Sequence, residues 1–274
     1  ITCRDWSSDV CSSDLADEIR LVVEKVAATM LLCRFSSVSR APAGPHQLDF
    51  EPLIPAIADE RQRALVEAAL GSALFCDAGN QSRSFAHQSY AEYLAAEYLS
   101  RFPLAQILDL VCLPAGSSRP VVPQLSELAA WLALRHNDFA NWLIEHEPEI
   151  LLRNDASALT ESQRERFVAR VLERMAREEA FDDWNLKRFY GTFRHSKLTD
   201  QLRPYLKNPE ISRFAIRAAI HLAELNESTE LLEDLLAIAK NADTDCHLRE
   251  EAMRAACAFI DRKSTRLNSS HGKL

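Results

Sequence analysis

Apolar side chains recur at helical spacing through most of the segment 103–260. The pattern is clearest in four stretches, which are 121–134, 160–179, 209–225 and 247–259. In each of them, apolar positions three and four residues apart share one face of a helix. Thr160 followed by Gln163 adds a capping box at the start of the second stretch. The spacing therefore predicts a mainly α protein whose helices are separated by short loops.

The last two of these helices are similar to each other. The run Arg217-Ala218-Ala219 matches Arg254-Ala255-Ala256 at an offset of 37 residues, and each run follows a helix and a short loop. Helix pairs at this interval resemble HEAT-type repeats, which bury their apolar faces by stacking into a solenoid. We therefore expect a right-handed α-solenoid of HEAT-like pairs over 103–260. A plain helical bundle gives similar spacing and is the alternative.

Both ends of the chain read like translated DNA adapter. Residues 5–15 are DWSSDVCSSDL and residues 261–271 are DRKSTRLNSSH. Codons exist for which the two coding strings are reverse complements apart from the last codon, and both resemble a common DNA-sequencing adapter read in frame. We therefore expect residues 1–15 and 261–274 to be adapter-derived, with a natural segment of about 16–260 that the DNA fragment cut at both ends.

Composition narrows the classes of partner. The chain has 40 acidic and 32 basic residues, a formal net charge of -8, which argues against a nucleic-acid-binding surface. No apolar run approaches the ~18 residues that span a bilayer, so we expect no membrane partner. Scattered cysteines without a CxxC pair indicate a reducing compartment, and we expect a cytoplasmic protein. Outside the two ends they are Cys33, Cys76, Cys112, Cys246 and Cys257.

The segment before Pro103 has a different organisation. We expect a helix over 16–34, a loop over 36–45, and a helical stretch that starts near Asp49 and resumes over 59–70, where Gly71 ends it. Two short apolar runs, 73–76 and 83–86, flank a Gly-Asn turn and predict a β-hairpin. A helix over 88–101 follows. A hairpin between helices is the layout of a winged-helix domain.

No catalytic or metal-binding motif occurs in the sequence. A phosphate-binding GxxxxGK[ST], HExxH, GxSxG and zinc-type cysteine and histidine spacing are all absent. We therefore expect no catalytic residue, no metal site and no cofactor bound by this chain alone.

The stretch Ser84–Leu99, SFAHQSYAEYLAAEYL, is the most specific pattern in the chain. Tyr90, Leu94 and Tyr98 recur four residues apart, so we expect them on one packed face, with Tyr93 also packing. From Phe85 to Ala96 the stretch resembles the F-x-H-x-x-[FY]-x-E-[YF]-[LF]-A-A signature in the winged helix of NACHT-type STAND ATPases. Tyr90 stands where that family often has phenylalanine.

The resemblance implies a nucleotide-dependent switch. Residues 16–102 would be the end of the ATPase module's helical domain plus the winged helix, and 103–260 the sensor repeats. In this family the histidine matching His87 contacts the β-phosphate of ADP. The parent protein would bind ATP or ADP with Mg through an upstream ATPase module that is missing here. It would form a homo-oligomer when a protein trigger binds the repeats, in signalling or antiphage defence.

Other interpretations of the same residues stay open. His87 would otherwise cap or pack at the junction, and Glu92 would pair with the missing module or lie exposed. Trp131, Trp142 and Trp184 are expected to anchor helices to each other. The whole chain would alternatively be a helical-repeat interaction scaffold without nucleotide. A DNA-binding winged helix is disfavoured, because its candidate recognition helix over 59–70 carries more acidic than basic residues.

Overall fold

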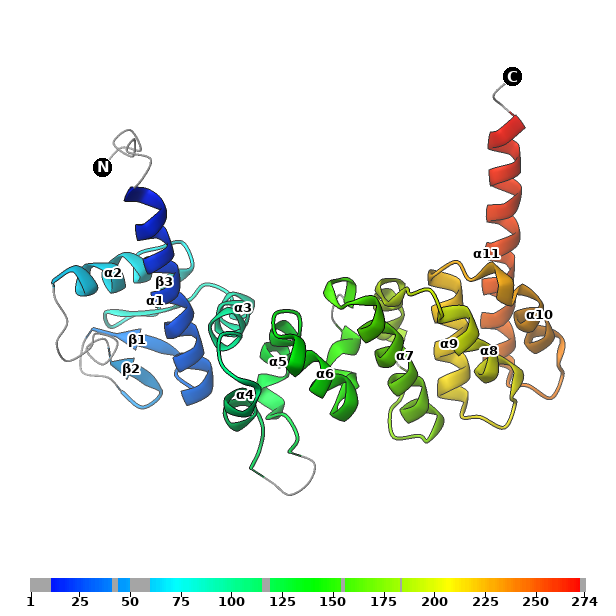
Figure 1. The fold of residues 1–274 in the computed structure, drawn as a ribbon, viewed down its shortest axis with the longest axis horizontal. Coiled ribbons are helices and arrows are strands. Elements are labelled where there is room, and N and C mark those ends of the chain that lie inside the picture. Colours follow the sequence, from blue (N-terminus) through cyan, green and yellow to red (C-terminus); the bar gives the residue numbers. More distant parts are fainter. Residues whose placement is uncertain are drawn as a thin grey trace. The chain divides into compact units, whose positions relative to one another are not determined.

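The computed structural model describes residues 11–40, 44–49, 60–114, 119–153, 156–182 and 184–271. The protein is mainly helical, with 69% helix and a small four-stranded mixed sheet near its N-terminus (Figure 1). It divides into two compact units, one up to Phe139 and one from Ala140. The functional division between residues 102 and 103 stays a prediction.

Three helices frame the first unit. They are α1 (Cys11–Cys33), α2 (Glu60–Leu70) and α3 (Gln88–Leu99), and α1 packs along both of the others (Figure 1). Apolar residues of α1 at helical spacing, Val23, Val26 and Met30, are buried there. Gly71 ends α2 as predicted, and its N–H donates to the carbonyl of Glu67 at 3.0 Å.

The sheet of the first unit has the order β2-β1-β4-β3. Its strands are β1 (Ser37–Ser39), β2 (Gln47–Asp49), β3 (Phe75–Asp77) and β4 (Ser82–Phe85). The predicted hairpin is confirmed, since β3 and β4 are antiparallel and the rings of Phe75 and Phe85 lie 4.3 Å apart. Gly79, at φ +78°, supplies the left-handed backbone of the turn.

Two predictions before α2 were wrong. Residues 37–39 are not loop, because β1 pairs antiparallel with β4 and parallel with β2, and all three of its residues are buried. Asp49 does not start a helix, because it ends β2. Strand β1 depends on β4, which is distant in sequence, and β2 depends on β1, so local sequence reveals neither strand. The rest of the interrupted helical stretch, 50–59, lies outside the described residues.

Short helices complete the first unit after α3. They are α4 (Leu104–Val111), the 3₁₀ turn η2 (Pro123–Leu125) and α5 (Ser126–Ala133). The helix expected over 121–134 begins late, because Val121 forms a β-bridge with Cys112 and Pro123 opens a 3₁₀ turn. Helix α5 packs against α3.

The described part of the second unit is built of helices. After α6 (Asn137–His146), which crosses the boundary, come η3 (Pro148–Arg153), η4 (Ala156–Ala158), α7 (Glu161–Ala176) and η5 (Trp184–Phe193). The capping box on α7 is confirmed: Thr160 Oγ1 accepts from the N–H of Gln163 at 3.3 Å, and the side chain of Gln163 accepts from the N–H of Thr160 at 3.0 Å. The aromatic-rich stretch WNLKRFYGTF forms the 3₁₀ helix η5.

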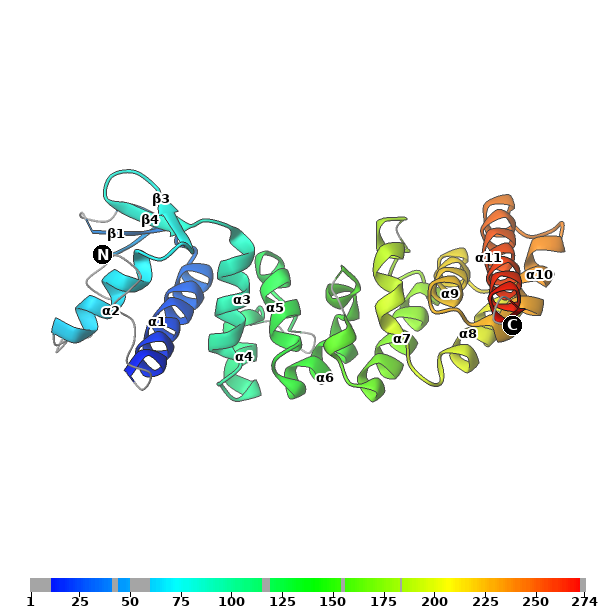
Figure 2. The same cartoon turned by 90° about the horizontal axis from the view of Figure 1, so that it is seen from above.

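Two helix pairs follow, α8 (Leu198–Lys207) with α9 (Arg213–Leu225), and α10 (Leu232–Lys240) with α11 (Cys246–His271). The 3₁₀ turn η6 (Thr229–Leu231) joins them. Helix α9 packs on α11 and α8 on α10 (Figure 2). Helices α9 and α11 start 33 residues apart, not 37. The two offsets differ by four residues, about one helical turn, so both alignments match the same apolar faces.

Candidate functional site

His87 lies between β4 and α3 and is the N-cap residue of α3. Its backbone is extended, with φ -146° and ψ 138°, and Nδ1 accepts a hydrogen bond from the backbone N–H of Ser89 at 3.2 Å. The hydroxyl of Ser89 lies 2.6 Å from the same nitrogen. The packing or capping interpretation of His87 therefore accounts for Nδ1.

The other ring nitrogen of His87 has a different role. Because Nδ1 accepts, the neutral imidazole carries its proton on Nε2. The side chain is exposed, so this N–H is available at the N-terminal end of α3, where the helix dipole favours an anion. The junction thus presents a donor of the kind that a phosphate oxygen accepts.

Tyr90 is not the packing residue that its spacing predicted. Leu94 is buried and Tyr98 half-buried, whereas Tyr90 is 46% exposed, and its ring centroid lies 5.9 Å from that of His87. Positions four apart rotate by about 40° per step on a 3.6-residue helix, so the three side chains drift across the surface of α3. His87 and Tyr90 together form an exposed aromatic pair.

Glu92 places a carboxyl group near the same end of α3. It is half-buried, and burial, reinforced by the charge of Glu127, raises its pKa despite a hydrogen bond from Gln88 and the proximity of His87.

Behind this end, a chain of ion pairs fixes α3 to its neighbours. Glu24 on α1 is fully buried and lies 2.8 Å from Arg20 and 2.5 Å from Arg101. Arg20 also reaches Glu97 of α3 at 3.3 Å, and Arg135 after α5 pairs with the same carboxylate. The chain joins α1, α3 and the end of α5. The sequence analysis missed it, although Glu24 interrupts an apolar helix face.

The tryptophans contribute to packing within each unit. Trp131 of α5 meets Tyr93 of α3 edge-on at 5.6 Å, which confirms both as anchors between helices. Trp142 stacks on His146 of its own helix at 4.7 Å. The side chain of Trp184 lies outside the described residues.

A buried polar cluster occupies the second unit, and the sequence analysis also missed it. His221 of α9 is fully buried, with Nε2 2.8 Å from Glu251 of α11 and Nδ1 3.6 Å from Asp182. Burial lowers the pKa of His221 to about 3 and raises that of Glu251, so each shift favours a neutral group. Asp182 accepts hydrogen bonds from Tyr190 at 2.5 Å and from Arg217 at 2.7 Å. Both oxygens of Asp182 thus accept hydrogen bonds inside a helical core, which indicates a structural role.

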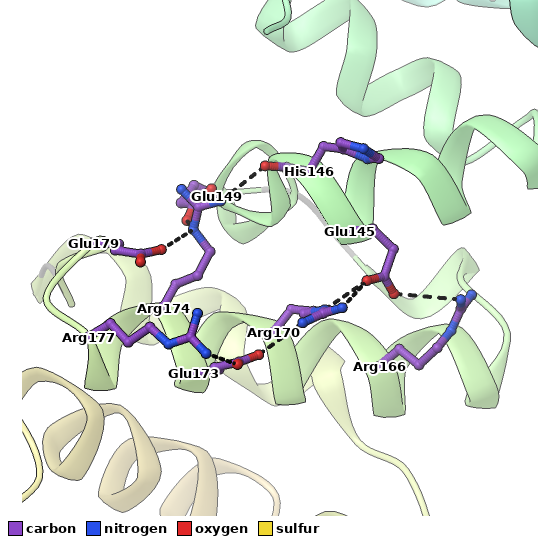
Figure 3. A network of polar contacts seen from close by, with 9 residues as sticks. All are labelled: Glu145, His146, Glu149, Arg166, Arg170, Glu173, Arg174, Arg177 and Glu179. Carbon is purple, nitrogen blue, oxygen red and sulfur yellow. Dashed lines mark hydrogen bonds and ion pairs between the residues drawn. The ribbon is translucent and has the colours of Figure 1, made fainter. Parts of the chain in front are cut away.

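A second polar network joins α7 to the end of α6 and to η3 (Figure 3). Arg166 and Arg170 share the carboxylate of Glu145, at 3.8 Å and 2.8 Å. One turn further, Nε of Arg174 lies 2.6 Å from Glu149. The arginines recur four residues apart and therefore line one face of α7. Each of them is matched by a glutamate, so this face is not an uncompensated basic surface.

Nothing in the described residues points to a metal or a membrane. They contain no group of three histidine, cysteine, aspartate or glutamate side chains that would hold a metal ion. They also contain no helix long and apolar enough to cross a bilayer. Comparisons with protein-family models, with curated proteins and with solved structures found no match. The fold and the site therefore define a mainly helical protein with a small mixed sheet and an exposed histidine at a helix N-terminus.

Proposed function

We propose that residues 16–260 are part of a NACHT-type STAND ATPase, a switch that exchanges ADP for ATP and signals when triggered. The carrying observation is His87, which lies in the family-like motif and presents an exposed Nε2–H at the start of α3. In this proposal His87 donates to the β-phosphate of ADP, which is bound with Mg in the upstream ATPase module. That contact holds the parent protein closed.

The arrangement of the first unit supports a winged helix. The hairpin β3–β4 follows α2 directly, and β1 adds to it antiparallel through β4. Two strands, β1 and β2, precede α2 and two follow it, and the antiparallel part β1-β4-β3 resembles the three-stranded sheet of a winged helix, to which β2 adds a parallel edge strand. The paired helices α8–α9 and α10–α11 support a right-handed, HEAT-like solenoid as the sensor of a protein trigger. Oligomerisation and antiphage defence follow from the resemblance alone.

Two variants of His87 test the phosphate contact in a complete protein that carries this segment. Asparagine is a good N-cap but lacks the Nε2–H, whereas alanine removes both functions. If His87 holds ADP, both variants should copurify with less ADP and show higher basal activity. His87→Asn should in addition unfold like the parent, while His87→Ala loses up to about 1 kcal/mol of helix capping. Normal ADP retention in His87→Asn would refute the phosphate role and leave His87 as a cap.

The second candidate is an interaction scaffold without nucleotide. The acidic neighbour Glu92 favours it, and the Nδ1 cap already gives His87 a structural task that needs no nucleotide. The sequence upstream of residue 16 in a longer protein separates the two functions. A phosphate-binding loop there supports the switch, and an upstream region without one supports the scaffold.

A further inference from the structure

The turns inside the two helix pairs are built alike. Asn208 opens the α8–α9 turn, and its Oδ1 accepts from the N–H of Glu210 at 3.1 Å. Asn241 opens the α10–α11 turn, and its Oδ1 accepts from the N–H of Asp243, also at 3.1 Å. Each turn thus carries an acidic residue two positions after its asparagine.

The same equivalence continues into the helices. Ser212 caps α9 by accepting from the N–H of Phe214 at 3.4 Å, and Asp245 caps α11 by accepting from that of His247 at 2.9 Å. The asparagine, the acidic residue and the N-cap residue of the first turn each recur 33 residues later in the second turn, which is also the spacing between the starts of α9 and α11. Side chains that bond to their own backbone in this way stiffen a turn. Both acidic residues are therefore held on rigid turns.

Both turns line one groove of about 760 Å³, a size typical of ligand sites. Its apolar side comes from all four helices of the two pairs and the turn between α8 and α9. The residues are Leu206, Ile211, Ile216, Ile238 and Leu248. Ile211 is half-buried and the other four are buried, so the groove has a packed apolar floor.

The charges at the rim of the groove are unequal. Asp234 is compensated, since Arg203 lies 3.3 Å and Lys207 3.7 Å from it. Glu210 and Asp243 are exposed, and neither forms an ion pair within the described part of the chain. The remaining cation that lines the groove is Arg213, whose guanidinium lies over the ring of Phe214 at 5.1 Å. An apolar floor is thus combined with an acidic rim.

We propose that this groove binds a partner protein through a short segment in which apolar side chains are flanked by lysine or arginine. The apolar residues would cover the isoleucine and leucine floor, and the cations would pair with Glu210 and Asp243. Rigid turns favour such a site, because less ordering entropy is lost on binding. This inference rests on the proposed sensor role for its biological meaning, but binding is measured without nucleotide, so either one can fail alone.

The test is an NMR titration of the chain with acetyl-Lys-Lys-Leu-Leu-Lys-Lys-amide. We expect amide shifts at the two turns, and an affinity that falls with added salt. Two matched peptides, one with glutamate for lysine and one with serine for leucine, should each bind at least about fivefold more weakly. Equal binding of the lysine and glutamate peptides would overturn the proposal.

Protein variants then locate the site. The double change Glu210→Lys and Asp243→Lys should weaken peptide binding about tenfold, because it removes both ion pairs between the rim of the groove and the lysines of the peptide. The matched control is the double change Asp200→Lys and Glu250→Lys, which alters the net charge by the same amount. These two side chains are 82% and 69% exposed and lie outside the groove. The control should therefore change peptide binding less than about threefold. Equal losses in the two double variants would refute the site. Self-association abolished by the groove variant, seen by sedimentation, would instead assign the groove to a second copy of this chain and overturn the proposal.

Discussion

Replacing Asp182 with asparagine should strongly destabilise the second unit. The side chain of Asp182 is fully buried, and each carboxylate oxygen accepts a hydrogen bond, one from Tyr190 at 2.5 Å and one from Arg217 at 2.7 Å. Asparagine keeps one acceptor and adds an NH₂ donor. An NH₂ group turned toward Arg217 would face another donor, one turned toward Tyr190 would require its hydroxyl to change from donor to acceptor, and in both orientations Arg217 loses its counter-charge.

The size of the loss follows from burial. A hydrogen bond to a charged group contributes about 1.5–3 kcal/mol, and breaking a buried ion pair costs about 3–5 kcal/mol when the remaining charge stays buried. The side chain of Arg217 is 28% exposed, so its charge regains some water. We therefore expect a loss of about 3 kcal/mol for Asp182→Asn. Tyr190→Phe removes one O–H and should cost about 1 kcal/mol.

Urea unfolding by circular dichroism measures this loss, with hydrogen exchange of the α9 amides as a local probe. The local probe is needed because two units do not necessarily unfold together. Asp200→Asn is the matched control, since Asp200 is 82% exposed and its nearest cation, Arg203, is 3.8 Å away. The control should cost less than about 0.5 kcal/mol. Equal losses for Asp182→Asn and Asp200→Asn would refute the reasoning.

Two further predictions concern charge in the second unit. The pKa of His221 is about 3 when folded, below the ordinary 6.5, so stability should fall as the pH drops from about 6.5 towards 3, by at most about 1.4 kcal/mol per pH unit. The raised pKa of Glu251 opposes this loss of stability, so Glu251→Gln should make the stability fall more steeply with decreasing pH above pH 4.5, as measured by urea titrations. An unchanged dependence of stability on pH would contradict the coupling of His221 and Glu251. Glu145→Gln removes the carboxylate shared by Arg166 and Arg170 and should cost about 0.5–1 kcal/mol in dilute salt, less at about 0.5 M NaCl. A cost independent of salt would show that this network stabilises by packing alone.

Local features of the fold were predictable because their partners are close in sequence. Thr160 and Gln163 of the capping box are three positions apart, and the β3–β4 hairpin reverses direction within a few residues. Strand β1 was not predictable, because its buried serines gain strand structure only by pairing with β4. The same applies to Asp182 and Arg217, which lie 35 residues apart in sequence and meet only when α9 packs beside η5.

The repeat illustrates a different limit of sequence reasoning. Matching apolar faces aligned Arg217 with Arg254, whereas the turns align Asn208 with Asn241. A shift of one helical turn preserves a face, so apolar spacing fixes the orientation of a helix but not its register. The turn residues fix the register, because each bonds to its own backbone at one position only. Short polar turns are therefore the better guide to repeat length in a chain of this kind.

At the candidate site, the two interpretations of His87 are compatible, because they use different atoms. The cap uses Nδ1 as an acceptor, which requires an unprotonated Nδ1 and so places the proton of the neutral ring on Nε2. A phosphate contact uses Nε2–H as a donor, which the cap therefore prepares. Protonating both ring nitrogens would make Nε2–H a stronger donor to phosphate, but Nδ1 could then no longer accept from the N–H of Ser89. A stronger phosphate contact would therefore cost the capping hydrogen bond of α3. Alanine removes both functions at once, and only a residue that caps without an imidazole can tell them apart.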